Sequence, residues 1–313
     1  TGRTSLAAGC VGGSKAMIRR AAEHATQRRQ FGTRIADFEM IRGKFARMMA
    51  NTYAIESLVY LTAGLVDRGL PDYALEGATC KILGTEAVWQ TINDALQIAG
   101  GNGFMEEYPY ERALRDSRIN MIFEGTNEIL RVLVALSGMR DVGEDLKEVG
   151  KALKAPLSSR GILSDYAARK IRSVAPARLT RAAAELAREA EIVTRYTAAA
   201  SNVLERVLRK HGKSVVEREY QQERAANVFM DLYASLAVLS RATSAVAAKG
   251  SEKAAGEVRL ARAFVQGAKY RIVGQLKDMD RNIGEPEDGR DALHTKISEA
   301  AYEQPGYTFH YWE

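Results

Sequence analysis

The combination of helix-forming composition and missing strand alternation is the feature that most limits the folds open to this chain. Only six of its 313 residues are prolines, and Ala, Leu, Arg, Glu and Lys are abundant, which favours long helices. Apolar residues recur at helical spacing, as at Ile41, Phe45 and Met48. No segment alternates apolar and polar residues over a sustained run, which excludes a sheet-based nucleotide-binding fold. The sequence therefore predicts an all-α protein.

Turn signals divide this helical chain into three parts. Residues 1–142 carry helices with short connections, which predicts an antiparallel four-helix bundle. Residues 143–176 are basic and interrupted by proline, so we interpret them as a partly ordered linker. Residues 177–313 return to long helical patterns and predict a second helical domain. The chain begins at Thr1 without a methionine, and we expect it to be a piece of a longer protein.

The composition also disfavours several kinds of site. Cys10 and Cys80 form no CxxC pattern, and the four histidines lack metal-ligand spacing, so no metal site is expected. No stretch approaches the ~20 apolar residues of a membrane span. The net charge of +6 permits an acidic partner, but the basic linker is too broken for a base-reading helix, so nucleic acid is not expected. Residues 147–181 interleave cations with apolar residues, which leaves open a solvated tether or peripheral contact with an anionic membrane.

Residues 119–131 contain the strongest catalytic candidate. An apolar run leads to Glu124, and Gly125 then permits a turn that a residue with a β-carbon would resist. Either Thr126 or Asn127 can cap the helix that follows. The apolar neighbours predict a collar around Glu124, and a carboxylate in such surroundings suits a general base. The alternative is an ordinary acidic residue at a helix start, where the dipole favours it.

Two other motifs flank helix ends. In QRRQFG, residues 27–32, the basic residues either complement the dipole of the preceding helix or meet a phosphate. In QIAGGNGF, residues 97–104, the glycines either end a helix or let the backbone approach a flat or anionic ligand.

Together with IFEGTNEI, residues 122–129, these motifs resemble the acyl-CoA dehydrogenases. The resemblance covers residues 1–140, and the helical extension beyond is similar to the very-long-chain branch of the family. It implies the C-terminal helical bundle of that family followed by a second helical domain, without the family's N-terminal and β domains.

The resemblance implies a specific reaction and cofactor. It is the FAD-dependent α,β-dehydrogenation of long or very-long-chain fatty acyl-CoA to trans-2-enoyl-CoA in fatty acid β-oxidation. Glu124 matches the base that removes the α-proton, and its backbone N–H would bind the thioester carbonyl. Some relatives carry the base just before the position of Arg3, where this chain has Gly2. The fragment alone is expected to be inactive, and the alternative is a non-catalytic scaffold or respiratory-complex assembly factor of the same ancestry.

The resemblance also implies binding residues and partners. The implied FAD contacts, several of them reaching a partner subunit's flavin, are Arg28, Gln30, Phe31, Gln97, Gly100, Gly101, Thr126 and Glu128. The implied acyl-CoA contacts are Arg3, Phe123 and Gly125. Glu39 and Glu128 stand where relatives carry glutamine. The implied partners are fatty acyl-CoA, an electron-transferring flavoprotein and a second copy in a homodimer. The expected location is the cytoplasm or the mitochondrial matrix, at the inner-membrane face if the linker binds lipid.

Overall fold

The described residues of the computed structural model are 2–154 and 179–307, and for residues 141–154 only the backbone is described. Within these ranges the chain is helical, apart from two strands of two residues each. The prediction of an all-α fold is confirmed.

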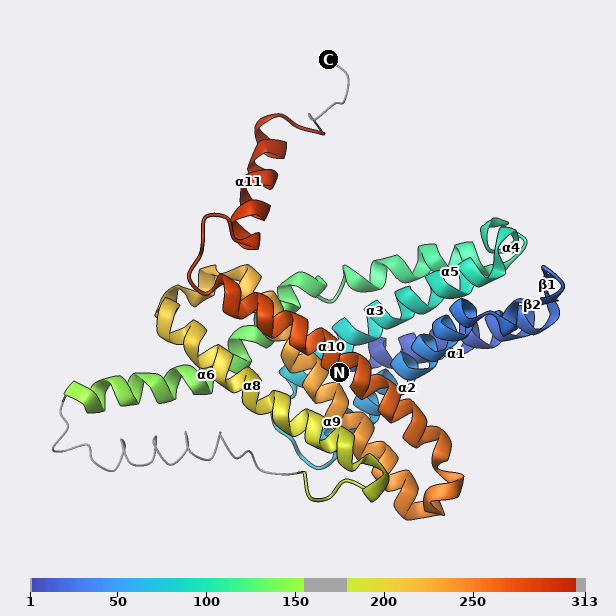
Figure 1. Ribbon diagram of the computed structural model, residues 1–313, viewed down its shortest axis with the longest axis horizontal. Coiled ribbons are helices and arrows are strands. Elements are labelled where there is room, and N and C mark those ends of the chain that lie inside the picture. The colour runs from blue at the N-terminus through green and yellow to red at the C-terminus, as the bar shows by residue number, and fades with distance from the viewer. Residues whose placement is uncertain (1, 155–178, 308–313) are drawn as a thin grey trace.

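Five helices build the N-terminal part of the molecule (Figure 1). They are α1 (Gly2–Gln27), α2 (Glu39–Asp67), α3 (Ala74–Ala99), α5 (Pro109–Arg118) and α6 (Asn127–Lys154). Helix α1 lies along α3, and α2 packs against both. The two adjacent glycines, Gly12 and Gly13, predict a break in this helix, and that prediction is wrong. Helix α1 continues through both, because its packing on its neighbours outweighs the ~1 kcal/mol that a helical glycine costs relative to alanine.

Short elements join these helices. Strands β1 (Arg29–Gln30) and β2 (Thr33–Arg34) form an antiparallel hairpin, followed by η1 (Ile35–Asp37). The short helix α4 (Gly101–Phe104) follows Gly100, and η2 (Ile119–Met121) follows α5. Asp37 does not cap α2, because its carboxylate instead accepts hydrogen bonds from Arg34 at 3.0 Å and Arg42 at 3.4 Å.

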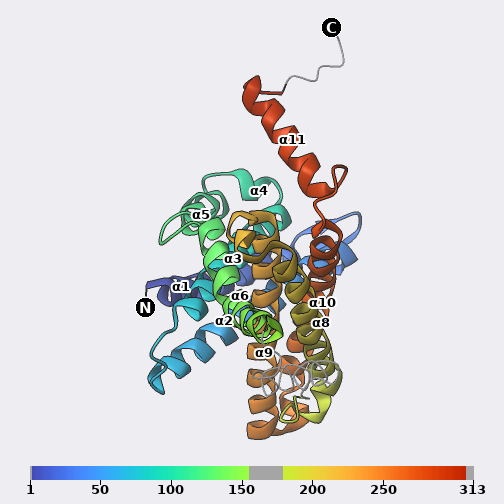
Figure 2. The ribbon, with the colours of Figure 1, turned by 90° about the vertical axis from the view of Figure 1, so that its left-hand side faces the viewer.

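The C-terminal part adds four long helices. They are α8 (Ala187–His211), α9 (Glu219–Lys253), α10 (Ala255–Asn282) and α11 (Arg290–Glu303), with η3 (Ala184–Leu186) and η4 (Gly212–Glu217) before α8 and α9. Gly250 is non-helical inside α9, and the hydroxyl of the next residue, Ser251, donates a hydrogen bond to the Glu185 carboxylate. Helix α11 projects from the body (Figures 1 and 2) and buries no residue.

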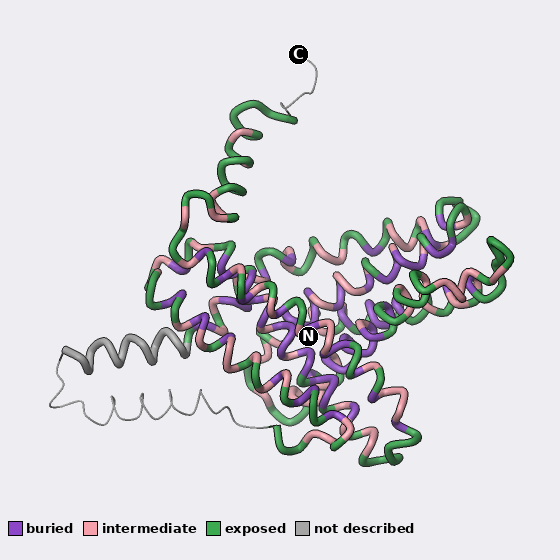
Figure 3. The backbone as a smooth tube through the Cα atoms, in the orientation of Figure 1, coloured by how far each residue is buried: buried purple, intermediate pink, exposed green. Residues whose placement is uncertain are grey.

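One hydrophobic core joins the two parts. Buried side chains of the N-terminal helices, such as Leu58, Ile82 and Leu130, belong to the same cluster as Val228 and Ile272 of the C-terminal helices. Figure 3 shows buried residues gathered where these helices cross. A smaller cluster fills the far end of the bundle, with Met17, Met48, Ile92, Ile98 and Tyr110. The N-terminal and C-terminal helices therefore stabilise each other.

The region interpreted as a linker begins inside a helix. Helix α6 runs on to Lys154, so the first residues of the range 143–176 continue it. Residues 155–178 lie outside the described residues, and with them lies most of the range 147–181 considered for membrane contact. Among the described residues, none of the helices is long and apolar enough to cross a bilayer.

Candidate functional site

Glu124 lies in a tight turn that enters α6. Its φ is 60°, and that of Gly125 is 96°, so two consecutive residues adopt the left-handed conformation. Glycine does so at little cost, but a non-glycine residue in this region costs of order 1–3 kcal/mol and persists only where its surroundings hold it. The sequence predicted the turn at Gly125, whereas the backbone of Glu124 itself is the strained element.

Two cationic side chains hold this turn by its carbonyl groups. The Arg3 Nε of α1 donates to the backbone oxygen of Glu124 at 3.2 Å. The Lys81 Nζ of α3 donates to the backbone oxygen of Gly125 at 2.9 Å. A β-carbon at Gly125 would lie 3.2 Å from the Leu130 side chain, so glycine is favoured there by space as well as by φ. The turn is thus fixed from both neighbouring helices.

Asn127 connects the same turn to α3. Its side chain is buried, accepts a hydrogen bond from Lys81 Nζ at 2.7 Å, and donates to Thr85 and Glu86, each at 3.1 Å. Thr126 is therefore the residue that caps α6, because its hydroxyl accepts from the Ile129 N–H at 3.4 Å. Sequence reasoning missed Lys81, although a lysine within the apolar stripe of α3 was a visible signal, and it considered Asn127 only as a helix cap.

Lys81 is an unusual charge for its position. It is 0% exposed and is among the largest fully buried side chains. Burial lowers the pKa of its ammonium, while the negative charges of Glu128 and Glu86 act in the opposite direction. Removing an ammonium from water is costly unless it is paired or hydrogen-bonded. Here Gly125 and Asn127 supply the oxygens that it needs.

The Glu124 carboxylate itself faces an open surface. The residue is exposed, and Ile122 and Phe123 beside it are 47% and 43% exposed. The apolar collar expected from the sequence is therefore not closed by the described residues, because none of their elements covers this face. A β-carbon placed on Gly2 would lie 3.3 Å from Glu124 Oε2. Position 2 and the Glu124 carboxylate thus share one location.

The other candidate residues fall into two groups. Thr126 and Glu128 lie beside Glu124 at the start of α6. Arg28, Gln30 and Phe31 lie at the hairpin after α1, and Gln97, Gly100 and Gly101 at the end of α3, at the same end of the bundle (Figure 1). The Arg3 end of α1 is about 39 Å from this end, given 26 residues at 1.5 Å each. One copy of the chain does not bring the two groups together.

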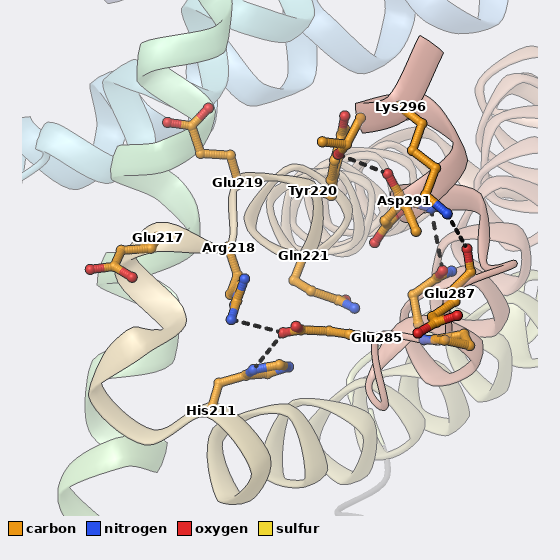
Figure 4. Close-up of a pocket in the computed structure, with 14 residues that line it drawn as sticks. His211, Glu217, Arg218, Glu219, Tyr220, Gln221, Glu285, Glu287, Asp291 and Lys296 are labelled. Atoms are coloured by element: carbon orange, nitrogen blue, oxygen red, sulfur yellow. Dashed lines mark hydrogen bonds and ion pairs between the residues drawn. The ribbon is translucent and has the colours of Figure 1, made fainter. Parts of the chain in front are cut away.

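A separate polar pocket of about 830 Å³ lies where α11 meets the ends of α8, α9 and α10 (Figure 4). Glu285 lies 3.4 Å from His211 Nδ1 and 3.0 Å from Arg218 Nη2. Burial lowers the pKa of His211, which the Glu285 charge opposes. The His211 Nε2, Arg218 Nε and Gln221 Oε1 are buried without a hydrogen-bond partner among the described residues. None of the candidate site residues lines this pocket.

Comparison with known protein families identifies both parts of the chain. Residues 1–139 match the family "Acyl-CoA dehydrogenase, C-terminal domain". Residues 184–307 match the family "ACAD9/ACADV, C-terminal domain". The two matches leave out residues 140–183, which include the last part of α6.

Individual relatives agree with these matches. The chain is 38% identical to the very long-chain specific acyl-CoA dehydrogenase, mitochondrial, of Rattus norvegicus, over 97% of this chain and 47% of the relative. It is 39% identical to the Homo sapiens protein of the same name, over 87% of this chain and 42% of the relative. The chain therefore spans about half the length of these relatives.

A solved structure has the same fold. It is an acyl-CoA dehydrogenase complexed with FAD from Bacillus anthracis, with a TM-score of 0.75 and 29% identity, covering 99% of this chain and 52% of that one. Both parts of the present chain, with the extension after α6, are included in that similarity.

Proposed function

Because the chain belongs to the acyl-CoA dehydrogenase family, we propose that it is the C-terminal part of an FAD-dependent long- or very-long-chain acyl-CoA dehydrogenase. The observation that carries this proposal is the Glu124 turn. A carboxylate reaches an open surface from a strained backbone that Arg3 and Lys81 hold in place. Such fixed geometry is what proton abstraction by a general base requires.

In the proposed reaction Glu124 removes a proton from the α-carbon of the thioester. The proton moves to a carboxylate oxygen, and negative charge develops on the thioester oxygen. The Glu124 N–H donates to no backbone carbonyl among the described residues, and it would donate to that oxygen and stabilise the charge. Phe123 and Gly125 flank the base and would contact the acyl-CoA, as would Arg3.

The residues at the far end of the bundle fit a flavin dinucleotide. Arg28 is an exposed cation, Phe31 is 94% exposed, and a β-carbon on Gly100 or Gly101 would meet no described atom within 4 Å. A cation, an exposed aromatic ring and an open glycine turn suit a ligand that is both anionic and flat. With Gln30 and Gln97 they would hold the FAD of a partner subunit, and Thr126 and Glu128 that of their own. FAD, when bound, accepts the hydride from the β-carbon.

The chain spans about half the length of its very long-chain relatives. We therefore propose that it needs the rest of its protein to bind FAD firmly, and that an electron-transferring flavoprotein and a homodimer partner complete the system. We propose domain limits of 1–142, 143–176 and 177–313. The relatives named as mitochondrial support a location in the mitochondrial matrix, and the cytoplasm is the alternative.

The test uses the full-length natural protein, loaded with flavin and mixed anaerobically with a long-chain acyl-CoA. The wild type should bleach the flavin absorbance, and Glu124→Gln should slow bleaching by about 10²–10⁴-fold, the usual contribution of a general base. Glu299→Gln, an exposed carboxylate of α11, is the matched control and should bleach normally.

A double variant tests the location of the base. Gly2→Glu combined with Glu124→Gly should recover part of the lost rate, because the new side chain starts 3.3 Å from the present carboxylate. Absence of flavin, or equal bleaching by wild type and Glu124→Gln, would support the non-catalytic scaffold instead.

A further inference from the structure

Side chains from two other helices, α1 and α3, hold the Glu124 turn in its conformation. A peptide group is planar, so fixing its carbonyl also fixes its N–H. The two carbonyls held by Arg3 and Lys81 belong to the peptides on either side of Gly125, directly after Glu124. Fixing these two peptides fixes φ and ψ of Gly125, and the Glu124 carbonyl held by Arg3 also restrains ψ of Glu124. Together the two hydrogen bonds hold the backbone from which the Glu124 side chain extends.

The support behind Lys81 is itself ordered. Asn127 accepts the second Lys81 hydrogen bond, and Glu86 accepts from Asn127. Glu86 also pairs with Arg131 at 2.8 Å, and Arg131 donates to Asn227 of α9 at 2.9 Å. The network therefore runs from the turn through α3 to the C-terminal helices. Both hydrogen bonds that Lys81 donates in this network go to residues of the turn, Gly125 and Asn127.

Stability alone does not account for a lysine here. A buried ammonium pays a desolvation penalty, and apolar residues of similar volume are often at least as stabilising. The residues before and after Lys81 in α3, Cys80 and Ile82, are apolar and each 0% exposed. What an apolar residue could not do is hold the Gly125 carbonyl while Glu124 stays left-handed.

We infer that Lys81 is a positioning residue, which fixes the Glu124–Gly125 turn in the geometry that proton abstraction needs. It touches neither substrate nor flavin and acts through the Gly125 carbonyl and Asn127. This role rests on the proposed function, because it assigns Lys81 a task in the reaction of Glu124.

The experiment uses the full-length, flavin-loaded protein with Lys81→Met, which keeps the length of the side chain and removes its donors. The kcat for a long-chain acyl-CoA should fall about 10²-fold, the effect of a misplacement near 1 Å, with a smaller change in KM. Without substrate, amide hydrogen exchange in residues 122–127 should become at least about 10-fold faster. Lys81→Gln, whose amide keeps a donor, should lie between Lys81→Met and the wild type in both measurements, and it replaces Lys81→Met if that variant does not fold.

Ile82→Ala is the matched control for lost stability. Ile82 is the next residue of α3, is equally buried and belongs to the core. It should lower the Tm and leave both kcat and exchange in residues 122–127 within about twofold of the wild type.

Lys81 has no positioning role if Lys81→Met, or Lys81→Gln in its place, keeps kcat and loop exchange within twofold of the wild type. The same holds if Ile82→Ala matches its losses. If the wild type does not bleach its flavin, the proposed function fails, while the exchange measurement still decides whether Lys81 holds the turn.

Discussion

Gly138 offers a direct test of how the two parts of the chain are joined. It lies in α6 where that helix crosses α9, and a β-carbon placed on it would be 2.4 Å and 2.8 Å from two ring carbons of Phe229. Carbon atoms pack at about 3.5–4.0 Å, so Gly138→Ala forces α6 and α9 apart or turns the ring. Overpacking of this kind costs about 1–3 kcal/mol. Since the overlap exceeds 1 Å, we take the upper end.

The alanine also gains helix propensity, about 1 kcal/mol over glycine. The expected net loss is therefore about 2 kcal/mol in the free energy of unfolding, measured by urea unfolding of the chain with circular dichroism. Gly274→Ala, at an exposed site of α10 with no atom within 4 Å of the new carbon, should instead stabilise by roughly 0.5–1 kcal/mol.

The double variant Gly138→Ala with Phe229→Leu separates the clash from other effects. Removing the ring should make the added methyl group less costly, so the two substitutions should be less destabilising together than their sum. The reasoning is refuted if Gly138→Ala is as stable as Gly274→Ala, or if the cost of the alanine is the same with and without the ring.

Two further predictions concern pH. The pKa of His211 is lowered below 6.5 by burial, with Glu285 opposing, so the unfolded chain binds more protons and stability should fall as pH drops below 6.5. His211→Asn should remove that part of the dependence in unfolding midpoints measured from pH 7 to 5. Burial would raise the pKa of Asp94, but hydrogen bonds and charge from Lys44 and Arg47 outweigh it and hold the pKa below 3.8. The ionised carboxylate should therefore stabilise the fold above pH 3.8, and this stabilisation should be lost as the pH falls through the lower folded-state pKa. Asp94→Asn should lower stability at pH 7 by an amount that shrinks towards pH 2, and a constant difference between the two proteins would contradict the assignment.

Local signals were sufficient for most of the helices. Scarce proline and helical spacing predicted the all-α fold, Gly100 and Gly212 mark the ends of α3 and α8, and Thr126 caps α6 as one of two foreseen candidates. These features depend on residues close together in the sequence. Propensity and capping act over that range, so the pattern was readable.

The remaining features depend on contacts between distant residues. Nothing near Glu124 in the sequence predicts its left-handed backbone, because the groups that hold it come from Arg3 and Lys81, 121 and 44 residues away from their acceptors. The open face around Ile122 was likewise invisible, since a collar requires elements across from it. The shared core of the N-terminal and C-terminal helices depends on which faces meet in space, which periodicity alone leaves undecided.

Helix α6 joins the Glu124 turn to the C-terminal helices. It begins directly after the Glu124 turn, and its buried Leu130 and Val134 anchor it in the shared core. Helix α6 also contacts α9, because Arg131 donates a hydrogen bond to Asn227 of α9 and Gly138 lies against the ring of Phe229 of α9. Displacing α9 would therefore release α6, whose first turn carries Asn127. The side-chain oxygen of Asn127 is one of the two oxygens that accept hydrogen bonds from Lys81. The C-terminal extension thus braces the candidate base through α6, although none of its described residues contacts Glu124 by a hydrogen bond or ion pair.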